Sequence, residues 1–332
     1  MNLATGEALG RSELRPLPSR SGRAARARLF DRVHFGVLRG VALLVFAAVA
    51  LIAWECAVGA WPALRAYGLP FLWSSEWDPV AERFGALPYL FGTAVSSTVA
   101  LLLAVPLGIG TAVYLVELAP RGVGSAVSFV VELLAAIPSI VYGLWGLFVL
   151  APLLRTTVEP WLIHHLGFLP LFQGFPFGIG MLNASLVLAV MIVPTIVSIS
   201  REVLRSMPRA LREAALGLGA TRSEAMAVTL DAARPGILGA VILALGRALG
   251  ETMAVTMVIG NTNHISASLL APASTMSSVI ANEFTEATGK LHMSALIEIA
   301  LVLLVVAVIV NASARLLVIW ATGGRRDVAG AA

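Results

Sequence analysis

The chain has 332 residues, of which 58% are hydrophobic and only 13% are charged, and its mean hydropathy is +0.88. A soluble domain is usually about a quarter charged, so this composition excludes a soluble globular enzyme and indicates a protein of the lipid bilayer. The single cysteine, Cys56, excludes any disulfide within the chain.

The net charge of +4 is distributed unevenly along the chain. Eight arginines precede or open the first apolar run, with almost no aromatic residues among them: Arg11, Arg15, Arg20, Arg23, Arg26, Arg28, Arg32 and Arg39. This placement is typical of positive-inside anchoring and disfavours nucleic acid as a partner. Residues 1–33 contain too little apolar surface to fold alone, so we predict a disordered basic cytoplasmic tail there.

Six apolar runs are long enough to cross about 30 Å of hydrocarbon, which takes about 20 helical residues. They cover residues 37–58, 88–118, 125–154, 177–200, 236–260 and 294–320. The first run is longer than the roughly 7 to 15 apolar residues of a signal-peptide core, so we predict a retained transmembrane helix at 34–60.

The connections between these runs alternate in charge, and this alternation predicts the orientation. Arginines occur in the tail, in the Arg121 turn, in residues 201–234 and in the C-terminal segment 321–332, which are therefore predicted to be cytoplasmic. The cation-poor loops 61–87 and 261–293 are then periplasmic, and the outer tryptophans suit a membrane interface or a partner surface. Six spans place both termini on the cytoplasmic side.

Prolines interrupt three of the runs, at Pro106, Pro138 and Pro194. Each proline removes a backbone hydrogen bond, so we expect a kink near all three positions. The neighbouring hydroxyls of Ser139 and Thr195 can satisfy freed backbone groups. These kinks are equally compatible with simple helix packing and with a substrate path.

The polar segment 201–234 keeps a helical pattern. Four apolar residues recur at steps of four, four and three and form one stripe on a helix: Met207, Leu211, Ala215 and Leu218. Gly217 and Gly219 permit a turn, and Thr221 and Glu224 have the spacing of a capping box at the start of a second short helix. The apolar stripe predicts that the first helix docks on another surface.

Within this segment, Glu213-Ala214-Ala215 and the later Gly219 resemble the cytoplasmic loop of ABC importer permeases. The resemblance implies docking on an ATPase subunit, whereas an amphipathic connection lying on membrane lipid is the alternative. The chain departs from the family at Leu230-Asp231, where Leu-Pro is usual. No G-x-x-x-x-G-K-[ST] motif is present in the sequence, so nucleotide must be bound by a partner.

Two charges, Arg247 and Glu251, lie inside the fifth apolar run. Residues four apart share a helix face, so we predict an ion pair between them. Each charge alone costs roughly 2.5 to 3.5 kcal/mol at the centre of a span, so both must face protein or water. A guanidinium suits a phosphate-type oxyanion, and a buried pair that only fixes helix register is the alternative.

Four longer stretches carry a more specific resemblance: ELLAAIPSIVYGLWGLF from Glu132, IVPTIVSISREVL from Ile192, GRALGETMAVTMVIGN from Gly246 and APASTMSSVIANEFTEAT from Ala271. They resemble the PstC family of phosphate ABC importer permeases. The last stretch also has a helical apolar stripe, formed by Met276, Ile280, Phe284 and Ala287.

The resemblance implies an all-α, polytopic membrane protein with six transmembrane helices and the type I ABC importer permease fold, its permease domain covering 88–320. It implies phosphate import across the bacterial cytoplasmic (inner) membrane, driven by ATP hydrolysis in other subunits, so the chain itself is not expected to be an enzyme. The implied partners are a PstA-like second permease, two PstB-like ATP-binding subunits and a PstS-like phosphate-binding protein. A type I permease for sulfate or molybdate and a membrane scaffold for phosphate sensing are the alternatives.

The expected substrate path contains Arg247, Glu251, Ser139 and Thr195, with Glu132 as a weaker candidate. The expected ATPase coupling loop contains Met207, Leu211, Glu213, Ala214, Ala215, Leu218 and Gly219. We expect no catalytic residue and no cofactor. His164 and His165 have no carboxylate or cysteine nearby at ligand spacing, so we expect no metal site either.

Overall fold

The structure, a computed structural model, describes residues 21–329. The chain divides into two units, Met1–Trp54 and Glu55–Ala332. Regular structure in the described residues is helical, apart from isolated β-bridges at Asp78–Arg83 and Gly260–Ala273. The all-α prediction is confirmed.

Helix α1 (Ser21–Tyr67) forms the described part of the first unit and continues into the second. Residues 34–52 are all exposed and mostly apolar, as expected of a helix whose solvent is lipid. The helix is longer than the predicted 34–60. Residues 21–33 of the predicted disordered tail are helical, because alanine and arginine favour helix and extend an existing one without new nucleation. The rest of that predicted tail lies outside the described residues.

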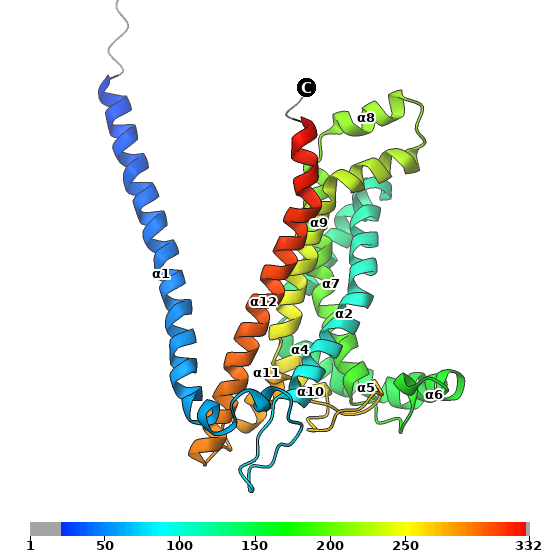
Figure 1. Ribbon diagram of the computed structural model, residues 1–332. Coiled ribbons are helices and arrows are strands. Elements are labelled where there is room, and N and C mark those ends of the chain that lie inside the picture. The colour runs from blue at the N-terminus through cyan, green and yellow to red at the C-terminus, as the bar shows by residue number, and fades with distance from the viewer. Residues whose placement is uncertain (1–20, 330–332) are drawn as a thin grey trace, which may run out of the picture. The chain divides into compact units, whose positions relative to one another are not determined.

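The second unit is a bundle of helices of very different lengths (Figure 1). After α1 they are α2 (Leu87–Val113), α3 (Arg121–Ala136), α4 (Ser139–Trp145), α5 (Ala151–Leu153), α6 (Glu159–Leu166), α7 (Met181–Ser206), α8 (Arg209–Gly217), α9 (Arg222–Gly250), α10 (Met253–Val258), α11 (Met276–Glu283) and α12 (Lys290–Ala329). Short 3-10 or π-helical pieces accompany them: η1 (Leu69–Leu72), η2 (Tyr114–Leu118), η3 (Gly146–Leu150), η4 (Leu154–Val158) and η5 (Pro170–Phe172).

Six helical segments among the described residues are long and apolar enough to cross a membrane, as the sequence predicted. They are His34–Tyr67, Leu87–Leu118, Ser139–Leu166, Met181–Ser206, Arg222–Gly250 and Lys290–Leu316. The chain is therefore a multi-pass membrane protein, although several of the predicted boundaries are wrong.

The predicted bounds of the third span, 125–154, are wrong, because the helix breaks at Ile137 and Pro138. Both residues have extended backbone, with ψ angles of 129° and 141°. Proline lacks the N–H that a helix needs and disfavours the helical region for the residue before it. The shorter helix α3 therefore precedes the break, and the long apolar segment Ser139–Leu166 follows it.

The predicted bounds of the fifth span, 236–260, are wrong at both ends. Helix α9 begins at Arg222, so the predicted second short helix and the span form one continuous helix that ends at Gly250. Glycine weakens a helix. A new helix, α10, begins at Met253. The Glu251 side chain accepts a hydrogen bond of 3.2 Å from the backbone N–H of Ala254 in its first turn.

The predicted cytoplasmic segments are shorter than expected. In the segment 201–234, α7 continues to Ser206 and α9 begins at Arg222, so only the short helix α8 and its turns separate the two long helices. Helix α12 continues to Ala329, so the predicted tail 321–332 is helical in its described part. Polar residues adjoining an apolar helix extend it at no nucleation cost.

Helix α7 is the centre of the second unit. Of its most apolar stretch, 67% is buried, against 28% for the four other spans of this unit and 0% for α1. Helices α2 and α9 pack along α7. Small residues on their buried faces allow this close approach: Ala100, Ala104, Ala244 and Ala248. The predicted kink sites Pro106 and Pro194 lie within α2 and α7, which continue through them.

Different helices lie at the two ends of this unit (Figure 1). Helix α8 and the end of α12 lie at one end, which we call the α8 end; α11 and α6 lie at the other, the α11 end. A second core at the α11 end packs Phe71, Tyr89, Met276 and Leu296 together. Helix α11 confirms part of the predicted stripe but ends at Glu283, so Phe284 and Ala287 lie beyond it.

Candidate functional site

Two interrupted helices meet in the second unit. One interruption separates α3 from α4, and the other separates α9 from α10. Helix α4 packs on α10 so closely that a Cβ atom at Gly143 would lie 2.8 Å from Met257 Sδ and 3.0 Å from Ala254 Cα. Only glycine permits this approach without a shift of the backbone. Irregular backbone inside a membrane bundle is tolerated where protein or a watery cavity covers it.

Arg247 lies in the last turn of α9, beside these interruptions. Its side chain is exposed and forms no hydrogen bond or ion pair within the part of the chain that the structure describes. Tyr142 of α4 is an electrostatic neighbour of Arg247, and its hydroxyl donates a hydrogen bond of 2.7 Å to Leu134 O across the α3–α4 break. A guanidinium cannot face hydrocarbon cheaply, so this face of α9 must meet water or a partner.

Glu251 is not the ion-pair partner that its spacing predicted. The helix that would align it with Arg247 ends one residue earlier, and Glu251 has extended backbone with φ −70° and ψ 126°. Its carboxylate caps α10, and its backbone oxygen accepts a hydrogen bond of 2.7 Å from Ser277 Oγ of α11. Glu251 therefore shapes the break and links it to the α11 end.

The other two predicted path residues lie on different helices. Ser139 is the first residue of α4, directly after the break, and is half-buried. Thr195 is half-buried on α7 beside Pro194. Neither hydroxyl forms a hydrogen bond among the described residues. Ser139 thus lies at the α3–α4 break, on the same helix as Tyr142, the electrostatic neighbour of Arg247. Thr195 has no contact that joins it to this group.

The predicted coupling loop forms an exposed helix at the α8 end (Figure 1). No residue of α8 is buried, and its apolar side chains Leu211 and Leu216 are exposed, as is the following Leu218, at 90%. Gly219 has a φ angle of +89°, in the left-handed region that favours glycine. The capping box is confirmed: the Thr221 N–H donates to Glu224 at 2.7 Å, and the Glu224 N–H donates to Thr221 at 3.3 Å.

Two ion pairs near the α8 end were not predicted. Arg212 of α8 pairs with Glu117 in η2, which continues α2, and the Glu117 side chain is nearly buried. Arg201 near the end of α7 pairs with Glu132 of α3 at 2.9 Å. Periodicity cannot detect such pairs, because their members lie far apart in sequence. The only local signal is a carboxylate inside or at the end of an apolar run.

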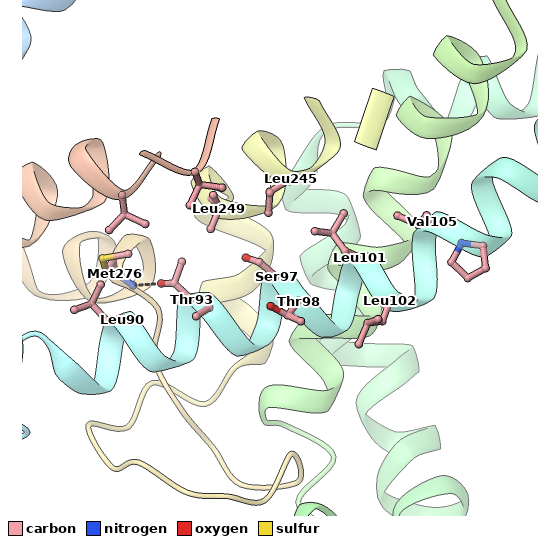
Figure 2. A pocket seen from close by; sticks show the side chains of 14 residues that line it. Leu90, Thr93, Ser97, Thr98, Leu101, Leu102, Val105, Leu245, Leu249 and Met276 are labelled. Carbon is pink, nitrogen blue, oxygen red and sulfur yellow. Dashed lines mark hydrogen bonds between the residues drawn. The ribbon is translucent and has the colours of Figure 1, made fainter. Parts of the chain in front are cut away.

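A cavity of about 540 Å³ lies between α2, α9, α11 and α12 (Figure 2). Leucine and valine dominate the 14 residues that line it, and the polar ones are the hydroxyl residues Thr93, Ser97 and Thr98. The Thr93 hydroxyl oxygen already accepts a hydrogen bond of 3.0 Å from the Met276 N–H. An oxyanion here would lose its hydration without gaining a charged donor. This cavity therefore does not fit an anion.

Comparison with known proteins identifies the family. Residues 104–320 match the family of binding-protein-dependent transport system inner membrane components. The phosphate transport system permease protein PstC of Mesorhizobium japonicum is 48% identical over 302 residues, which cover 90% of this chain and 92% of that protein. The protein of the same name from Pasteurella multocida is 45% identical over 285 residues, 84% of this chain and 89% of that protein.

A solved structure has the same fold. The bacterial alginate ABC transporter, determined in complex with an alginate pentasaccharide-bound periplasmic protein, contains a chain that superposes with a TM-score of 0.56. The match covers 86% of this chain and 96% of that one, and at 19% sequence identity it shows the fold alone. The type I importer permease fold is thus confirmed. The chain belongs to the family of binding-protein-dependent transport system inner membrane components and, within it, groups with the relatives named PstC.

Proposed function

We propose that this chain is the permease subunit of an ABC importer that moves inorganic phosphate across the bacterial cytoplasmic membrane. The observation that carries the proposal is Arg247, an exposed guanidinium without a protein partner among the described residues, placed beside two interrupted helices of an apolar bundle. Relatives at 45% and 48% identity that are named phosphate transport permeases support the choice of phosphate.

The path residues have separate roles in this proposal. Arg247 offers a planar fork of N–H donors to two oxygens of the anion. Ser139, at the start of α4, and Thr195, on α7, supply hydroxyl donors whose hydrogens are not otherwise engaged. Glu251 acts on the path indirectly, because its cap on α10 and its bond with Ser277 hold the break in shape.

ATP hydrolysis takes place in other subunits and reaches this chain through α8. Its exposed apolar side chains need a partner surface, and we assign this surface to a PstB-like ATP-binding subunit. The residues of the docking surface are Leu211, Glu213, Ala214, Ala215, Leu218 and Gly219. Met207, predicted as part of the same stripe, does not belong to it, because the helix breaks before α8 and Met207 packs against the core that contains Leu204 and Ile237. The Arg212–Glu117 pair then carries movement of α8 to the end of α2.

The complete importer contains a PstA-like second permease, which closes the path opposite Arg247, and a PstS-like phosphate-binding protein outside. The α8 end and both termini are cytoplasmic in this arrangement, and the α11 end is periplasmic. The arginines of the α7–α9 connection support this orientation.

Radiolabelled phosphate uptake tests the function. Cells lacking every other phosphate system should lose uptake when this chain is deleted and regain it when the gene is restored. Excess unlabelled phosphate should compete with the label, and excess sulfate should not. Uptake that survives the deletion contradicts the proposal, as does equal competition by sulfate, which would assign the path to another oxyanion.

A further inference from the structure

A polar cavity lies near the α8 end, between η2, α3 and α7. Its volume is about 580 Å³, and five polar residues line it: Ser125, Ser128, Glu132, Arg201 and Arg205. We call it the Arg201 cavity. Unlike the apolar cavity of Figure 2, it combines charged groups with hydroxyls.

The Arg201 cavity is distinct from the surroundings of Arg247. Val203 lies between the two cavity arginines and packs against α9, so closely that a Cβ at Gly236 would be 2.5 Å from Val203 Cγ1. Arg247 is 11 residues further along α9, which corresponds to about 16 Å of helix. One anion therefore cannot contact both groups.

The charges of the cavity are unequal. Arg201 is largely buried, with its side chain 15% exposed, and its Nη2 donates to Glu132 Oε1 at 2.9 Å. Arg205, one helical turn further on, is exposed and has no ion pair or hydrogen bond among the described residues. Two guanidinium groups thus face one carboxylate, which leaves an excess positive charge for an anion.

A buried hydroxyl also lacks a partner. Ser128 is 8% exposed, and its Oγ atom forms no hydrogen bond in the described structure. Buried polar groups are nearly always hydrogen-bonded, so an unpaired one in a polar cavity indicates a missing ligand or water. Ser125, one turn earlier on α3, adds a second hydroxyl to the same wall.

We propose that the Arg201 cavity binds inorganic phosphate as its monohydrogen form. Arg205, the remaining donors of Arg201 and the Ser128 hydroxyl bind its charged oxygens. One carboxylate oxygen of Glu132 stays paired with Arg201, and the other accepts a hydrogen bond from the phosphate O–H. Sulfate has no O–H, and neither does the phosphodiester of a membrane lipid, so both would bring an unprotonated oxygen against the Glu132 carboxylate. This proposal adds a site on the cytoplasmic side and does not require Arg247.

The test is protection of a cysteine placed in the cavity wall. Ser125→Cys is introduced into the complete complex in the Cys56→Ser background, purified in nanodiscs of neutral lipid, and its rate of modification by a small thiol reagent is measured. Saturating phosphate should slow modification about ten-fold, as expected when most sites are occupied. Sulfate should not slow it. The neighbouring Ala126→Cys, also exposed but not lining the cavity, should be unaffected by either anion.

Further variants separate binding from structure. Arg205→Gln and, independently, Ser128→Ala should each weaken protection by phosphate, with Arg205→Gln raising the half-protecting concentration about ten-fold, as for loss of one charge-assisted hydrogen bond. Glu132→Gln should abolish the preference for phosphate over sulfate. Arg247→Gln should leave protection intact, so the outcome is independent of the transport assay.

Three results would overturn the proposal. One is equal modification rates with and without phosphate at Ser125→Cys. Another is protection that Arg205→Gln and Ser128→Ala both leave unchanged. The third is protection that appears without added phosphate when the nanodiscs contain phosphatidylglycerol, because it would assign the cavity to a lipid headgroup.

Discussion

Arg212 and Arg247 differ in what holds their guanidinium groups. Arg212 belongs to the exposed helix α8, yet a nearly buried carboxylate, Glu117, fixes it to the end of α2. Arg247 lies in an apolar helix, where a partner would reduce its cost most, and it has none among the described residues. In the proposed importer, this difference separates two uses of charge: the paired arginine joins two helices mechanically, and the unpaired one keeps its donors for the anion.

The first prediction sharpens the comparison by assigning the α8 end, where Arg212 lies, to the cytoplasm and the α11 end to the outside. Ser75 at the α11 end and Ser223 in the first turn of α9 are both exposed. With Cys56 replaced by serine, an impermeant thiol reagent applied to intact cells should label Ser75→Cys and leave Ser223→Cys unlabelled. Permeabilised cells serve as the control, since both sites should react there. Labelling of Ser223→Cys alone would mean that the orientation is inverted.

The second prediction concerns removal of the unpaired guanidinium of Arg247. Arg247→Gln should lower the rate of phosphate uptake about 100-fold, the order expected when a charge-assisted bidentate contact is lost. Arg247→Lys keeps the charge without the fork and should retain an intermediate rate. Arg155→Gln, at an exposed arginine in η4, is the matched control and should transport normally.

The alternative role for Arg247, fixation of helix register, predicts another result for a charge swap. The double variant Arg247→Glu with Glu251→Arg should not restore transport, because the two side chains form no pair in the structure and Glu251 caps α10. Subunit assembly is measured in parallel by co-purification. Near-normal uptake by the swapped variant contradicts the path role.

The third prediction concerns the turn after α8. Gly219→Val should weaken co-purification of the ATPase subunit about ten-fold, because a β-branched residue at a φ of +89° is strained by roughly 1 to 3 kcal/mol. A Cβ there would meet no atom within 4 Å, so the effect comes from the backbone alone. Gly219→Asn is the control, since asparagine tolerates positive φ. If both variants bind the ATPase equally well, the turn does not position the docking helix.

The fourth prediction concerns loss of the Arg212–Glu117 ion pair, for which we expect the smallest effect. Glu117→Gln should lower substrate-stimulated ATP hydrolysis about three-fold, because Arg212 is partly exposed and solvent screens the pair. The matched control is Glu76→Gln, which removes the exposed Glu76–Arg83 pair at the α11 end and should change nothing. ATPase rates that match the unmodified complex in both variants would show that the Arg212 pair transmits no movement.

Local residue patterns determined much of the fold. The six apolar spans follow from composition over some 20 residues at a time, because each helix must cover its own backbone in lipid. The capping box at Thr221 and the left-handed turn at Gly219 are equally local, and the sequence predicted the box and a turn there. Arg247 was recognisable because a charge in an apolar run is costly wherever the helix packs.

Tertiary structure decided where the helices stop and which charges meet. Pro138 and Pro194 are both prolines in apolar runs, but only the first ends a helix, since α7 is enclosed by its neighbours and continues. The spacing of Arg247 and Glu251 predicted a pair that the end of α9 at Gly250 prevents. Arg212–Glu117 and Arg201–Glu132 join residues far apart in sequence. Such contacts depend on how whole helices pack, and the periodicity of one segment carries no information about its partner.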